Sequence, residues 1–150
     1  FPANFVKGVI DLYIAMRDDN YDLAIKAYKS WGFNDLSKDL IKVLNVWALY
    51  IYGPLLENKK RQIQDPNAKQ NGKEVASNVY KELKKLGGVA PPKEFVLIDR
   101  AAVGLGSVFM HLNAELNWHK IIEKLIENFD EKELYKRQVN ILKKFKIKET

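Results

Sequence analysis

Residues 91–113 read PPKEFVLIDRAAVGLGSVFMHLN and contain the most regular apolar pattern of the chain. After the opening Pro91–Pro92, apolar side chains recur in steps of three and four residues at Phe95, Ile98, Ala102, Leu105, Phe109 and Leu112. That spacing places all of them on one face of an α-helix, because successive residues are rotated by about 100° around the helix axis. The segment therefore predicts a long amphipathic helix.

The same helical period extends in both directions from this segment. Apolar stripes predict further helices around residues 5–14, 23–31, 40–51, 75–86, 121–129 and 135–145. No strand-like alternation of useful length interrupts them. The sequence therefore predicts an all-α fold, an irregular array of about seven helices rather than a clean four-helix bundle.

Short polar or glycine-containing breaks mark where these helices begin and end. Three residues are predicted N-caps, whose side chains accept a backbone hydrogen bond at a helix start: Ser37, Asn117 and Asp130. We expect Gly32 to close the second helix in a left-handed conformation. Gly53–Pro54 is expected to bend or end the third helix, because proline lacks the backbone donor that a helix interior needs.

Composition sets the size and class of the protein. With 150 residues, 47% of them apolar and 29% charged, residues 1–150 predict a single domain able to bury its own core. No cysteine is present, which excludes disulfides and thiolate metal sites. The apolar run Val43–Leu56 is interrupted by polar and helix-breaking residues, so we predict no membrane-spanning helix. The polar segment 57–72 is predicted to be a mobile loop.

The net charge of +6 is unevenly distributed. Residues 57–86 and 130–150 carry net charges of +4 and +3, whereas the rest of the chain is close to neutral. Acidic residues are interspersed and the aromatic residues fall on the apolar stripes, so nucleic-acid binding is disfavoured. The last helix, with Lys136, Lys143 and Lys144, either packs as a terminal helix with exposed lysines or lies on an anionic membrane surface.

Residue types that could carry catalysis or bind a metal do not form a recognisable motif. His111 and His119 are eight residues apart with only Glu115 nearby, which disfavours a metal site. The acidic group around Asp18–Asp22 lies at a helix junction, where aspartate favours caps and turns. Gly104–Leu105–Gly106 lies inside a helix, where missing side chains let another helix approach. We assign no catalytic, cofactor-binding or metal-binding residue.

Arg100 is a charged residue in an otherwise strongly apolar helix. It lies on a narrow polar line opposite the apolar stripe of its helix, together with Lys93, Gly104, Ser107 and His111. One interpretation is a structural salt bridge or an exposed polar edge. The other is an anchor for another segment or for an anionic ligand, because an unpaired buried guanidinium is costly.

Residues 91–113 resemble the C-terminal helical region of the UbiB/AarF family of atypical protein-kinase-like proteins. The shared pattern is a Pro-Pro opener, a helix with an arginine step at Arg100, a glycine-containing run, and Leu112–Asn113. The N-terminal stretch is similar to the segment located directly after the family's Asp-Phe-Gly motif. That similarity is carried by Phe1–Pro2 through Phe5–Val6, Ala15–Asn20 and Trp31–Gly32–Phe33.

The resemblance implies the C-terminal part of a kinase-like C-lobe, cut from a longer protein. Family members bind ATP and Mg²⁺, act as ATPases or kinase-like enzymes, and support isoprenoid quinone biosynthesis at membranes. This chain lacks their nucleotide loop, paired Lys and Glu, catalytic-loop residues and metal-binding Asp, so it would be non-catalytic. Its partner would be the N-terminal kinase-like lobe, and its location cytoplasmic or peripheral to a membrane.

One further expectation and one alternative accompany this hypothesis. If a lobe is missing, the apolar stripes of the first and fifth helices are expected to be exposed. The alternative hypothesis is a free-standing helical module that contacts a protein or a membrane surface.

Overall fold

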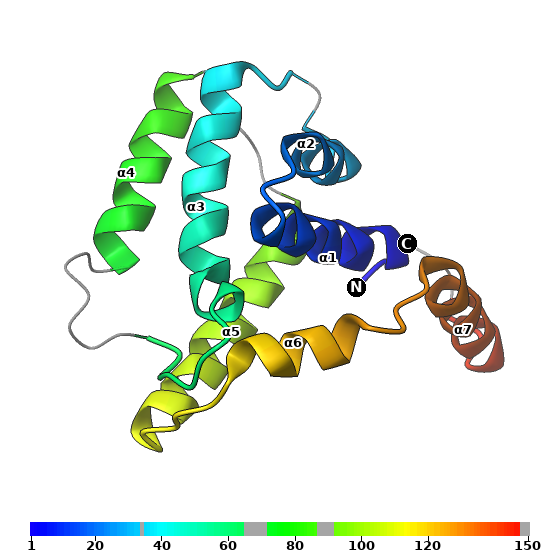
Figure 1. Ribbon diagram of the computed structural model, residues 1–150. Coiled ribbons are helices and arrows are strands. Elements are labelled where there is room, and N and C mark those ends of the chain that lie inside the picture. Colours follow the sequence, from blue (N-terminus) through cyan, green and yellow to red (C-terminus); the bar gives the residue numbers. More distant parts are fainter. Residues whose placement is uncertain (34, 65–71, 87–91, 148–150) are drawn as a thin grey trace.

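The computed structural model describes residues 1–33, 35–64, 72–86 and 92–147, and these are mostly helical (Figure 1). The helices in these ranges are α1 (Ala3–Arg17), α2 (Tyr21–Ser30), α3 (Lys38–Leu56), α4 (Gly72–Lys85), α5 (Lys93–His111), α6 (Trp118–Ile126) and α7 (Glu131–Lys144). The only β-type pairing among the described residues is an isolated antiparallel bridge between Arg61 and Leu116. The predicted all-α fold class is confirmed.

The predicted helix caps are present. Ser37, Asn117 and Asp130 each accept a hydrogen bond from the backbone N–H three residues later, at 2.9–3.1 Å. Each such cap is worth about 1 kcal/mol to its helix. Asn20 caps α2 in the same way. Gly32 follows α2 with φ of +89°, which is the left-handed conformation expected there.

Proline in α3 did not end the helix as its position suggested. Gly53–Pro54 is expected to bend or end this helix; α3 continues to Leu56 with Pro54 inside, so it does not end there, and the bend stays a prediction. The carbonyl of Leu55 in the last turn accepts a hydrogen bond from Nδ1 of His119, at 2.9 Å. A tertiary contact therefore satisfies a helix-end carbonyl that the local sequence leaves without a partner.

The core lies where α1, α2 and α3 meet. Its buried members are Leu12, Ala15, Ala24, Ala27, Tyr28, Phe33, Ile41 and Ala48. Alanines on α1 and α2 let the two helices approach closely, and Figure 1 shows α2 above α1 on the same side of α3. The buried hydroxyl of Tyr28 donates to Oδ1 of Asn45 at 2.7 Å, so a polar group in this core has its partner.

A second point of close packing ties the beginning of α5 to α1. Gly8 faces Trp31, and a Cβ at this position would lie 2.5 Å from the indole Nε1. The indole donates to the carbonyl of Phe5 at 3.3 Å. The ring of Phe95 then packs edge-on against Trp31 and Phe5, with centroid distances of 4.9 and 5.1 Å.

The remaining helices pack around α1 and α3. Val75 and Val79 of α4 are buried, and α4 packs on α3. Trp118 at the start of α6 is buried and its indole donates to the carbonyl of Arg61 at 2.8 Å. The segment before residue 65 is thereby paired with the α5–α6 connection. Part of the predicted mobile loop, residues 65–71, lies outside the described residues, and its mobility stays a prediction.

Helix α3 is also long and apolar enough to cross a membrane. It is the single helix among the described residues that meets this test by length and composition, with a mean hydropathy of 1.2. Core helices of soluble proteins meet the same test, and α3 contributes Leu40, Ile41 and Ala48 to the core. However, only 17% of the apolar stretch of α3 is buried, and Val46 and Leu49 on this helix are exposed.

Candidate functional site

The strongest candidate site is the surface of α5. The helix begins at Lys93 after Pro92, whose extended backbone and fixed φ suit a helix start. Its inner face is held near each end by an aromatic contact. Phe95 packs on Trp31, and Phe109 packs on Trp118 with centroids 4.8 Å apart. The helix is therefore anchored at two points along its inner side.

Apart from Phe95, Ile98 and Phe109, the apolar side chains of α5 are exposed to solvent. Val103 is 73% exposed, Leu105 60% and Leu112 70%. Val96, Leu97 and Val108 are also more than half exposed. The most regular apolar stripe of the sequence is thus only partly buried, and the predicted exposure of the fifth helix is confirmed. The same expectation for the first helix is wrong, because α2, α3 and α7 pack on α1.

The exposed residues surround α5 rather than forming one edge. Val96, Val103 and Met110 follow one another at intervals of seven residues along one flank, and Leu97 and Val108 lie on the opposite flank. In an ideal helix, residues seven positions apart differ by only about 20° around the axis, so Val96, Val103 and Met110 form an almost straight row along the helix. A helix that is apolar around most of its circumference is typical of one covered on several sides.

The polar line predicted on α5 lies between these two flanks. Arg100 is exposed, and no ion pair joins it to another described side chain. Its assignment as an anion anchor stays a prediction. His111 on the same line is engaged locally, because its Nδ1 lies 2.9 Å from the carbonyl oxygen of Ser107.

The glycines of α5 do not have the role predicted for them. A Cβ added at Gly104 or Gly106 would meet nothing within 4 Å. The expectation that missing side chains admit a neighbouring helix is therefore wrong for the described part of the molecule. The backbone of α5 at Gly104 is open to solvent, as are the side chains around it.

A polar cluster that sequence reasoning missed joins α1 to α6. The hydroxyl of Tyr13 donates to Oε1 of Glu123 at 2.8 Å, and Arg17 donates to both carboxylate oxygens at 2.8 and 3.0 Å. Arg17 also pairs with Asp18. Nδ1 of His119 lies 3.4 Å from the same Tyr13 hydroxyl. Tyr13 and Arg17 are four residues apart on α1, and His119 and Glu123 are four residues apart on α6, so each pair lies on one helix face. That spacing is the one sequence signal that could have pointed to the cluster.

The electrostatics of this cluster indicate a structural role. Hydrogen bonds from Arg17 first, and then from Tyr13, hold the pKa of Glu123 below its usual range. Burial, reinforced by the hydrogen bond to Glu123, raises the pKa of Tyr13. The hydrogen bonds accepted by Glu123 come from these two side chains, which leaves the carboxylate poorly suited to accept a substrate proton. We therefore assign the cluster the task of holding α6 on α1.

The acidic group at the α1–α2 junction is a turn, as predicted. Asp19 has φ of +50°, a left-handed conformation that aspartate tolerates better than most residues. Asp22 lies in the first turn of α2, where it faces the positive end of the helix dipole. The side chain that caps α2 is Asn20.

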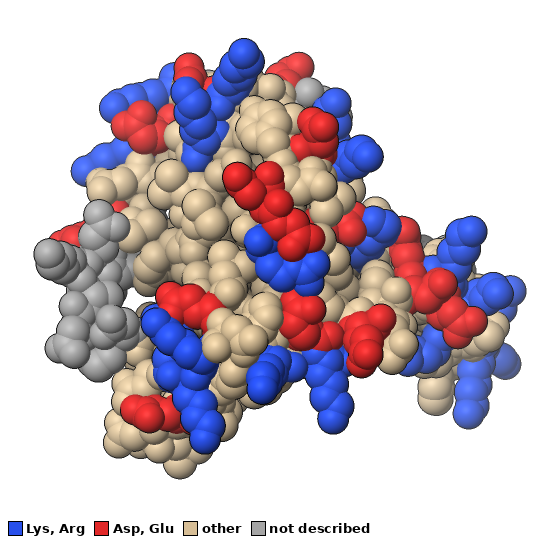
Figure 2. All heavy atoms as spheres, in the orientation of Figure 1, with Lys and Arg blue, Asp and Glu red and all other residues tan. Residues whose placement is uncertain are grey.

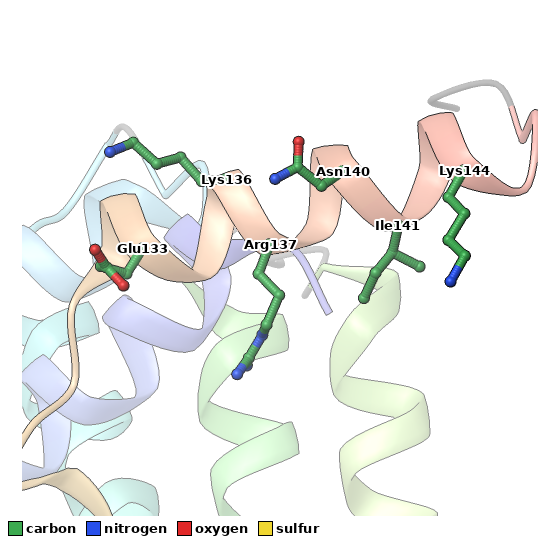
Figure 3. A pocket seen from close by; sticks show the side chains of 6 residues that line it. All are labelled: Glu133, Lys136, Arg137, Asn140, Ile141 and Lys144. Atoms are coloured by element: carbon green, nitrogen blue, oxygen red, sulfur yellow. The ribbon is translucent and has the colours of Figure 1, made fainter.

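The basic residues of the C-terminal helix lie on its solvent side. Figure 2 shows basic and acidic side chains mixed over most of the visible face, with several basic groups pointing outward around α7. Lys136, Lys143 and Lys144 are exposed, so the structure brings none of them to a partner side chain of the core. A shallow depression along α7 is lined by Glu133, Lys136, Arg137, Asn140, Ile141 and Lys144 (Figure 3).

We compared the chain with protein families, curated proteins and solved structures. No family model matches the chain, and no curated protein or solved structure matches it.

Proposed function

We propose that this chain is the non-catalytic C-terminal helical portion of a longer UbiB/AarF-like atypical kinase or ATPase linked to isoprenoid quinone biosynthesis. In this proposal α5 packs against the N-terminal kinase-like lobe of the parent protein. ATP and Mg²⁺ would bind to that lobe, and this chain would supply none of their ligands. The parent protein would be cytoplasmic and peripheral to a membrane.

The observation that carries the proposal is the exposure of apolar side chains around α5. Val103, Leu105 and Leu112 are each at least 60% exposed. Burying one such side chain fully is worth about 1.5–3 kcal/mol, so covering several of them would stabilise an assembly substantially. The resemblance of residues 91–113 to the family names the lobe that would cover them.

The genomic sequence upstream of Phe1 tests the origin of the chain. We expect it to encode an Asp-Phe-Gly-like motif shortly before Phe1, preceded by a lobe with a nucleotide loop and a strand lysine. An initiator methionine immediately before Phe1, or an unrelated upstream sequence, would remove the proposal. It would leave the free-standing interaction module as the better hypothesis.

The docking role of α5 is tested by binding to the separately expressed upstream lobe. Leu105→Asp places a charge in the proposed contact and should weaken binding by at least tenfold. The matched control is Leu125→Asp on α6, because Leu125 is 73% exposed and belongs to another surface. Both positions are exposed, so circular dichroism should show the same helical content for both variants. Equal binding by the two variants would refute docking through α5.

The absence of a catalytic role is tested by nucleotide. Any ligand that binds the folded state raises its stability by mass action. Mg-ATP should therefore leave the thermal unfolding of this chain unchanged, whereas it should stabilise the longer parent protein. A clear upward shift for this chain alone would show that it has its own nucleotide or anion site. Arg100→Ala would then be the first variant to measure.

A further inference from the structure

The C-terminal half of α7 has an unusual charge distribution. Acidic residues occur at the helix start, at Asp130, Glu131 and Glu133. Residues 134–147 contain five basic side chains and no acidic one. The five are Lys136, Arg137, Lys143, Lys144 and Lys146. Stabilisation by the helix dipole explains acidic residues in the first turn and Lys143 and Lys144 in the last, but it does not extend to Lys136 and Arg137 in the middle of the helix.

The apolar side of α7 is only partly used for packing. The helix packs on α1, and Nε2 of Gln138 donates to the carbonyl of Phe1, two residues before α1 begins, at 2.7 Å. Leu134 and Leu142, four residues to either side of Gln138, are half-buried on the same face. Beyond this contact the helix projects from the body of the molecule, at the lower right of Figure 1. Its outer end is therefore accessible to a large flat partner.

That outer end carries exposed apolar groups next to the cations. Phe145 is 64% exposed, and Ile141 and Ile147 are each about half exposed. Figure 3 shows Arg137, Ile141 and Lys144 extending from the same side of α7. Phe145 lies one helical turn after Ile141. These two exposed apolar side chains therefore lie on the same side of the helix as Arg137 and Lys144.

We propose that the segment 137–147 binds an anionic lipid surface. Ile141, Phe145 and Ile147 enter the boundary between headgroups and acyl chains. The basic side chains reach headgroup phosphates, since long lysine and arginine side chains keep their charge in water while their stems lie along apolar surface. Alternating cations and exposed apolar groups at one end of a helix are the pattern of interfacial binding.

Other partners of negative charge fit these observations less well. A protein groove that accepts an amphipathic helix needs its apolar row, and the row containing Leu134 and Leu142 already packs on α1. A nucleic acid would use the cations but would leave Ile141 and Ile147 in water. It would also favour a stacking platform of several aromatic rings, of which the segment has one, at Phe145.

The test is sedimentation of the full chain with vesicles of phosphatidylcholine, with or without phosphatidylserine. We expect binding only when phosphatidylserine is present, and weaker binding as salt concentration rises. Each basic residue near such a surface is worth about a fivefold change in affinity, so Lys143→Gln with Lys144→Gln should weaken binding about 25-fold. Lys81→Gln with Lys84→Gln on α4 removes the same charge from two exposed positions elsewhere and should have little effect.

A third variant separates lipid insertion from simple attraction between charges. Phe145→Ser removes an exposed ring, leaves the net charge unchanged, and should weaken vesicle binding by about tenfold. Its binding to polyglutamate or to duplex DNA, measured in parallel, should not change. Absence of sedimentation with phosphatidylserine vesicles would overturn the proposal. So would equal loss in the α4 control, or vesicle binding that is insensitive to Phe145. None of these outcomes depends on the docking role of α5.

Discussion

Replacing Gly8 with alanine should destabilise the protein, although the same change stabilises most helices. Alanine in place of glycine favours a helix interior by about 1 kcal/mol. At Gly8, however, the new Cβ would lie 2.5 Å from Nε1 and 2.8 Å from Cε2 of Trp31. Moving the indole costs about 1–3 kcal/mol in overpacking. It also weakens the hydrogen bond to the Phe5 carbonyl, worth about 1 kcal/mol.

The net expectation for Gly8→Ala is a loss of about 1–3 kcal/mol in the free energy of unfolding. The indole cannot simply rotate away, because Phe95 packs edge-on against it. The matched control is Gly104→Ala, also in a helix interior but with nothing within 4 Å of the new methyl group. That variant should gain about 0.5–1 kcal/mol.

Urea denaturation followed by circular dichroism measures both variants. The two changes are chemically identical, so helix propensity cancels when they are compared and the difference reports the contact with Trp31. A Gly8→Ala protein as stable as the Gly104→Ala protein would refute the packing of α1 against Trp31. It would also call into question the anchoring of Phe95, and hence the placement of the first turns of α5.

Three other substitutions probe a buried hydrogen bond, an ion pair and a helix cap. Tyr28→Phe leaves Asn45 without its buried donor and should cost about 1 kcal/mol in urea denaturation, with little change in helical content. Glu123 has a pKa lowered in the folded state by Arg17. It therefore contributes stability that is present above its ordinary pKa of 4.5 and lost as pH falls below it; Glu123→Gln should flatten the acid limb of a stability–pH profile. Asp130→Ala removes the α7 cap and should lower the melting temperature by a few degrees, and an unchanged value would mean that α7 contributes little to the folded state.

The helices and their caps could be predicted from the sequence because the causes are local. Ser37, Asn117 and Asp130 act on backbone groups within three residues, and an apolar stripe arises from the rotation per residue alone. Pro54 marks the limit of this reasoning. The helix continues past Pro54 to Leu56, and the carbonyl of Leu55 in its last turn bonds to His119, which lies 64 residues further along the chain.

The candidate site likewise has features that the local sequence predicts and features that depend on tertiary contacts. The sequence analysis singled out residues 91–113 and the polar line through Arg100; α5 occupies Lys93–His111 of that segment and contains the polar line, as predicted. The cluster of Tyr13, Arg17 and Glu123 was missed, because residues more than 100 positions apart become neighbours only when α6 packs on α3 next to α1.

Local sequence was enough to establish that the chain is helical, where most helices begin, and which face of each is apolar. It could not establish which apolar face would be covered. The stripes of α1 and α5 look alike along the chain, yet Phe5, Leu12 and Tyr13 are buried whereas Leu105 and Leu112 lie in solvent. Hydrophobic burial is not directional, so periodicity specifies a face but not its partner. The packing of α2, α3 and α7 around α1 is what covers α1 and leaves most of α5 in water.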